Sequence, residues 1–179
     1  MTEEEKRAQR CCIVCGRPSC LKQYKQPELI AALSRSVHDA IDSGIRTFII
    51  PYRDGYDAIA ANVIVNIKKK VRDLRIVVAK PKSQAQKGMT RREEFLLRSC
   101  DLAVNIDEGQ KFYPSIMLDR WMVDHSSRLI VCRGDDFNDD INTLITYAEE
   151  QNVLVDDFVK YDMLRTYQKR KRTRENPYG

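Results

Sequence analysis

Short apolar runs alternate with amphipathic stretches along nearly the whole chain, and this alternation constrains the fold more than any other feature. Residues 48–50 and 76–78 are continuously apolar, as expected of strands that are covered on both faces. Between such runs, apolar residues recur at helical spacing, for example Leu29, Leu33 and Val37. Strands separated by helices need crossover connections, which make them parallel neighbours in one sheet.

The pattern therefore predicts an α/β fold, a Rossmann-like three-layer sandwich with a mainly parallel sheet of five or six strands. Strands are expected at residues 11–15, 47–50, 74–79, 101–106, 128–132 and 153–155. Helices are expected at residues 27–43, 55–71, 91–99, 115–124 and 139–151, with a terminal helix from residue 157. Gly44 should close the first helix, and Pro51 and Pro81 should end the second and third strands.

The 179 residues suit one domain, and their charge is distributed unevenly. Residues 160–179 hold seven Lys or Arg and two acids, whereas the other 159 residues hold 24 of each sign. The net charge of +5 thus belongs to the end of the chain. We expect a charged N-terminal segment at 1–10, a single domain at 11–158 and a basic extension at 159–179.

The expected location is the cytoplasm, without a membrane partner. No apolar run is long enough to span a bilayer, and residues 1–10 lack the apolar core of a secretory signal. The six cysteines are interpreted as thiols, because nothing indicates an oxidising compartment.

In parallel α/β sheets, ligands bind beyond the carboxyl ends of the strands, so the segments that follow the strands are the candidate site. Arg17 follows the first strand and could pair with a phosphate or carboxylate, or it could cap a helix C-terminus. Asp57 could bind a ribose hydroxyl, or it could cap the helix that follows. Both alternatives stay open for each residue.

Three segments resemble a known family. They are residues 11–18 (Cys-Cys-Ile-Val-Cys-Gly-Arg-Pro), 55–62 (Gly-Tyr-Asp-Ala-Ile-Ala-Ala-Asn) and 122–130 (Met-Val-Asp-His-Ser-Ser-Arg-Leu-Ile). In order and spacing they are similar to the YpsA-like branch of the SLOG superfamily of Rossmann-like nucleotide-binding proteins. That superfamily also includes DprA and the LOG/lysine-decarboxylase-like phosphoribohydrolases. The resemblance implies a nucleotide or nucleotide-derived ligand, such as one like ADP-ribose, and a homo-oligomer formed through helices.

The chain also departs from the family pattern. Cys15 and Pro51 stand where the family has Gly, Asn62 stands where it has Glu, and residues 134–139 (Gly-Asp-Asp-Phe-Asn-Asp) replace a Gly-Gly-Thr loop. Asn62 cannot ionise and so cannot act as a general base. We therefore expect binding without catalysis, and no catalytic residue or cofactor is assigned. The alternative is a nucleotide N-glycosidase-like hydrolase in which Asp57 replaces the missing glutamate.

The residues expected to bind the ligand come from the ends of four strands. They are Cys15, Gly16, Arg17, Pro18, Gly55, Asp57, Gln84, Arg133 and Gly134. A further alternative is weak nucleic-acid contact, or binding of a protein partner, through the basic residues 169–174.

Three other groups of residues receive structural interpretations. Cys12, Cys15 and Cys20 have spacing that could suit zinc. Side chains alternate between the two faces of a strand, so Cys12 and Cys15, three residues apart, point to opposite faces, and no metal site is assigned. Residues 124–126 (Asp-His-Ser) lie at a helix end, where Asp124 and Ser126 are expected to make local backbone hydrogen bonds and His125 is not expected to be catalytic. Trp121 could stack on a base, but its helical spacing favours the core.

Overall fold

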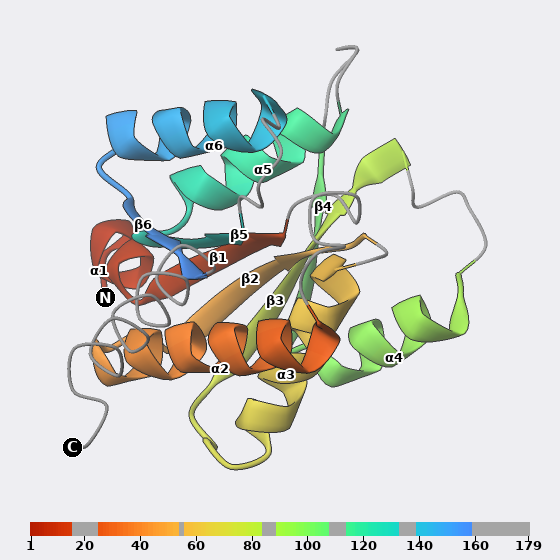
Figure 1. Ribbon diagram of the computed structural model, residues 1–179. Helices are drawn as coiled ribbons and strands as arrows, with labels where there is room; N and C mark the ends of the chain where they lie inside the picture. The colour runs from red at the N-terminus through yellow and green to blue at the C-terminus, as the bar shows by residue number, and fades with distance from the viewer. Residues whose placement is uncertain (16–24, 54–55, 84–88, 108–113, 133–138, 159–179) are drawn as a thin grey trace, which may run out of the picture.

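All six strands of the sheet are parallel, in the order β4-β3-β2-β1-β5-β6 (Figure 1). The computed structural model describes residues 1–15, 25–53, 56–83, 89–107, 114–132 and 139–158. The strands are β1 (Arg10–Cys15), β2 (Thr47–Pro51), β3 (Arg75–Pro81), β4 (Leu102–Ile106), β5 (Arg128–Cys132) and β6 (Leu154–Asp157). The helices are α1 (Glu3–Ala8), α2 (Gln26–Asp42), α3 (Tyr56–Lys68), α4 (Arg91–Ser99), α5 (Pro114–Asp124) and α6 (Asp139–Glu150).

Helices cover both faces of the sheet, as predicted for a three-layer sandwich. Helices α2, α3 and α4 lie on one face, and α5 and α6 lie on the other (Figure 1). Strand β1 shows how the sequence supplies two cores: Cys11 and Ile13 pack into the first layer, and Cys12 and Val14 pack into the second. All four side chains are buried, because a central parallel strand has no solvent face.

The local sequence explains where the helices begin and end. A proline lies in the first turn of α2, where its missing N–H costs nothing. Gly44 follows that helix with a φ of 101°, in the left-handed region that glycine adopts readily, which confirms that it ends the helix. Thr90 and Glu93 form a reciprocal capping box at the start of α4.

The structure corrects the prediction at both ends of the described chain. Helix α1 was not predicted, although Thr2 and Glu5 form a capping box that marks its start. Its Arg7 side chain donates to the carbonyl oxygens of Ser126 and Gln151, which fixes the helix against the domain.

At the other end, β6 runs to Asp157 and Phe158 is helical, so the terminal helix predicted from residue 157 starts one residue later. The rest of that predicted helix lies outside the described residues. Arg128 of β5 pairs with Asp156 and helps to keep β6 extended. The predicted basic extension at residues 159–179 lies outside the described residues. Within the described ranges, no helix combines the length and the hydropathy needed to cross a membrane.

Candidate functional site

The chain reverses its direction of strand addition between β1 and β5, and such a switch point is where open α/β sheets bind ligands. Cys15 and Cys132 are paired in register at the carboxyl ends of these two strands. Segments 16–18 and 133–134, which supply most of the predicted ligand-binding residues, directly follow them. The strand ends that precede these segments lie side by side, whereas the segments themselves lie outside the described residues.

Only two of the nine predicted ligand-binding residues lie in the described part of the chain. Cys15 is the last residue of β1, and Asp57 lies in the first turn of α3. The others lie outside the described residues: Gly16, Arg17, Pro18, Gly55, Gln84, Arg133 and Gly134.

Arg53 lies at the centre of the described part of this edge. It follows β2 by two residues, and its guanidinium donates from all three nitrogens. Nε donates to Asp57 Oδ2 at 3.0 Å, Nη2 to Asp119 Oδ1 at 2.7 Å and Nη1 to Asp119 Oδ2 at 3.3 Å. The paired geometry on Asp119 is the bidentate arrangement that a planar guanidinium favours. We call these three residues the Arg53 cluster.

The Arg53 cluster joins the two helical layers across the end of the sheet. Asp57 belongs to α3 on one face, and Asp119 belongs to α5 on the other. The side chains of Arg53, Asp57 and Asp119 are 22%, 7% and 16% exposed. The sequence analysis predicted Asp57 as a site residue but neither Arg53 nor Asp119. The position of Arg53 in a segment that follows a strand was the only feature of the sequence that could have identified it.

In the Arg53 cluster, burial and the neighbouring charges shift the pKa values of the side chains in opposite directions. Burial disfavours the charged guanidinium, yet the carboxylates of Asp119 and Asp57 raise the pKa of Arg53 above its ordinary value. Burial raises the pKa of the Asp119 carboxyl, and the attraction of Arg53 opposes that rise. The cluster therefore holds a fixed cation at the carboxyl edge, and this cation favours the ionised form of Asp119.

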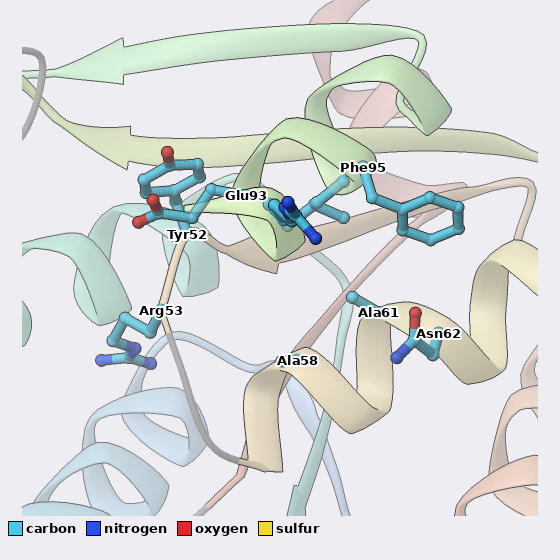
Figure 2. A pocket seen from close by; sticks show the side chains of 9 residues that line it. Tyr52, Arg53, Ala58, Ala61, Asn62, Glu93 and Phe95 are labelled. Carbon is cyan, nitrogen blue, oxygen red and sulfur yellow. The ribbon is translucent and has the colours of Figure 1, made fainter. Parts of the chain in front are cut away.

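A cavity of about 260 Å³ opens beside this cluster, between α3 and α4. Its lining residues come from the end of β2 and from these two helices: Tyr52, Arg53, Ala58, Ala61, Asn62, Arg91, Glu93, Phe95 and Leu96. Figure 2 shows Asn62 on α3 across from the α4 residues, with the Arg53 side chain pointing away from Glu93 and Phe95. Asp57 is absent from this lining because its carboxylate is held by Arg53.

The cavity combines aromatic, cationic and acidic groups. Phe95 is 50% exposed, which is unusual for a large apolar side chain beside an available core. Arg91 and Asn62 are exposed, whereas Tyr52 is buried under the Lys80 ammonium, which lies 4.6 Å from the ring centre. Hydrogen bonds from the Thr90 backbone and side chain and from Tyr52 lower the pKa of Glu93, so this carboxylate is an acceptor at neutral pH.

The other residues singled out from the sequence have structural contacts. Cys11 and Cys12 point into different cores, and within the described ranges no three potential metal ligands come together. Cys20 and the side chain of Cys15 lie outside what the structure describes.

At the end of α5, His125 stacks on Trp121 and hydrogen-bonds the carbonyl of that residue. Trp121 is half-buried against the second core. Asp124 differs from the prediction, since its carboxylate accepts from the Tyr147 hydroxyl of α6 at 2.7 Å. Periodicity predicted both helices but could not show that they lie side by side.

Comparison of the chain with protein-family models and with curated proteins gives no match, so the resemblance to SLOG proteins stays a prediction.

Proposed function

We propose that the protein binds a nucleotide or nucleotide-derived ligand at the carboxyl edge of the sheet, with the α3–α4 cavity as one part of the site. The observation that carries the proposal is the position of this cavity. It opens beyond the end of β2, one strand from the switch point between β1 and β5. Ligands of open parallel sheets bind at this edge.

The chemistry of the cavity suits the parts of a nucleotide. The exposed ring of Phe95 offers a stacking surface for a base, and Arg91 offers a guanidinium for a phosphate. The Glu93 carboxylate can accept from ribose hydroxyls. The volume of about 260 Å³ is at the small end for a ligand pocket. We therefore infer that the ligand also extends toward the switch point.

The Arg53 cluster lies beside this site. Because its guanidinium is already bound to two carboxylates, Arg53 ties the end of β2 to the start of α3 and to α5 rather than acting as a free phosphate ligand. Asp57 likewise acts through Arg53. The hydrolase alternative required Asp57 to face the ligand, and the described geometry gives that alternative no support.

Thermal unfolding of the purified full chain with AMP, NAD or ADP-ribose tests the proposal. A ligand at about 100 times its Kd stabilises the folded state by roughly 2.7 kcal/mol, which raises the unfolding midpoint. Arg91→Ala and Phe95→Ala should each weaken binding about tenfold or more while leaving the ligand-free midpoint nearly unchanged, because both side chains are exposed.

Arg98→Ala is the matched control. Arg98 lies on the same helix, pairs with Glu94 on the surface and does not line the cavity. It should keep the full ligand-induced shift. Absence of a shift with every nucleotide, or equal losses in Arg91→Ala and Arg98→Ala, would show that this cavity is not a nucleotide site.

A further inference from the structure

The two edges of the sheet differ in how they are protected. Strand β4 forms one edge, and β3 is its only partner within the described ranges. Its sequence, Leu-Ala-Val-Asn-Ile, contains no charge and no proline. Leu102 is 55% exposed, and Ala103 and Asn105 are exposed as well. An apolar edge strand of this kind offers unpaired backbone groups to another chain.

Strand β6 at the opposite edge shows the usual protection. It has four residues, and the last two are Asp156 and Asp157. Its short length discourages pairing with another strand, and Asp157 places a charge at its end, whereas Asp156 is buried against Arg128. Within the described residues β6 is therefore the better protected edge, although Leu154 of β6 is as exposed as Leu102 of β4.

Within the described residues, a groove of about 700 Å³ opens on the sheet face next to β4. Its lining combines apolar residues with polar and charged ones. The apolar residues are Ile49, Val77, Leu102, Val104 and Trp121, and the others are Glu3, Arg10, Thr47, Arg75, Asp101 and His125. Parallel sheets are nearly always covered on both faces, because their strands carry apolar residues on both sides. Leu102 and Val104 belong both to the groove lining and to the edge strand, so the apolar part of the groove reaches that edge.

We propose that β4 pairs antiparallel with β4 of a second copy of this chain, so that two sheets join into one across a two-fold axis. A two-fold axis perpendicular to the sheet makes two identical edges antiparallel. This axis also places the grooves of both copies on the same face of the joined sheet. Leu102 of one copy then packs beside Val104 of the other, which buries the most exposed apolar residue of the strand. This surface is separate from the proposed nucleotide site.

The charges that flank β4 select a register. With Ala103 on the axis, Asp101 lies opposite Asn105 of the second copy, and the amide can donate to the carboxylate. With Val104 on the axis, Asp101 would lie opposite Asp107, and like charges directly opposite each other are unfavourable. Asp101 is already bound by Lys68 and by the Ile76 backbone N–H, which holds its carboxylate at the start of β4. The Ala103-centred register is therefore preferred.

The mass of the full chain in solution, measured by light scattering and sedimentation velocity over a range of concentrations, provides the first test. We expect a dimer for the native chain. Leu102→Lys places a charge on the exposed edge and should weaken the dimer at least tenfold. Leu154→Lys introduces the same charge at an equally exposed position on β6 and should leave the dimer intact.

Cysteine crosslinking provides a second test that does not depend on the stability of the lysine variants. Directly opposed residues of an antiparallel pair have Cα atoms about 4.5–5.5 Å apart, within the range of a disulfide. Mild oxidation of Ala103→Cys should give a covalent dimer, and oxidation of Leu154→Cys or of the native chain should not. A monomer at every concentration, a dimer unaffected by Leu102→Lys, or no crosslink at position 103 would each overturn the proposal.

Discussion

Two arginines in this protein are buried against carboxylates, and they are satisfied to different degrees. Arg53 donates from all three of its guanidinium nitrogens to Asp57 and Asp119. Arg128 donates from Nη2 to Asp156 at 2.8 Å and from Nη1 to the Ser43 hydroxyl at 3.3 Å. Its Nε is buried without a hydrogen-bond partner among the described residues.

The positions of the two arginines explain this difference. Arg128 lies near the β6 edge, where one acid keeps a short strand in register. Arg53 lies at the carboxyl edge, where it joins two helical layers and borders a cavity. A fully bonded cation fixes the geometry of its surroundings, and this is the property that a binding site needs. The same pair of residue types therefore supports a strand in one place and a candidate site in the other.

Replacing Arg53 by Met should give the largest loss of stability. The substitution keeps the alkyl packing but leaves two buried carboxylates without a cation, which costs about 3–5 kcal/mol in the free energy of unfolding. Urea denaturation of the native chain and the variant at pH 7 measures this loss. A loss below about 1 kcal/mol would mean that the Arg53 cluster contributes no more than a surface ion pair.

The stability deficit of Arg53→Met should also depend on pH. Burial already raises the pKa of Asp119, and removal of Arg53 removes the attraction that opposes this rise. A carboxyl whose folded-state pKa is raised stabilises the fold below its unfolded pKa, near 3.9, and that stability is lost as the pH rises through the folded pKa.

The deficit should therefore be largest near pH 7 and shrink toward pH 4, by about 1.4 kcal/mol for each unit of pKa rise. Urea midpoints of the native chain and the variant at several pH values measure the change. Adding Asp119→Asn should remove this dependence on pH. A deficit that stays constant with pH would show that Asp119 remains ionised without Arg53.

Arg128→Met tests the other member of the comparison. It leaves one buried carboxylate, Asp156, and removes an Nε that had no partner, so we expect a smaller loss of about 2 kcal/mol. Urea denaturation of Arg128→Met and Arg53→Met under the same conditions compares their free energies of unfolding. A larger loss in Arg128→Met would show that the β6 edge depends more strongly on its ion pair than the carboxyl edge does.

The smallest effect is expected for Ser43→Ala. The Ser43 hydroxyl accepts from Arg128 at 3.3 Å and donates to the Ala40 carbonyl at the end of α2. Its removal leaves the Arg128–Asp156 pair in place, so the loss should be about 0.5 kcal/mol. A thermal midpoint several degrees below that of the native chain would mean that the hydroxyl holds Arg128 in position.

Much of the fold could be predicted because it depends on local pattern. Apolar runs and helical periodicity located six strands and five helices, and Gly44 correctly marked the end of one of them. Helix α1 was missed because it buries no residue, so periodicity gave no signal for it. The local evidence for it was the capping box and the charge pattern, with acidic residues in the first turn and basic residues in the last.

The candidate site was less predictable, since its contacts join distant parts of the chain. Arg53 and Asp119 are 66 residues apart, and nothing in either local sequence indicates the other. Arg91 and Phe95 face the cavity only because α4 lies beside α3. No periodicity contains that information.

The sequence by itself determined the type of each element from β1 onward and the covering of a parallel sheet on both faces, because backbone preference and apolar spacing act within a few residues. The tertiary structure decided the order of the strands, and therefore which strands became edges. It also decided which acids would face Arg53 and which helix would complete the cavity. These outcomes depend on how whole layers pack against each other. Contacts between layers form only when segments distant in the chain come together.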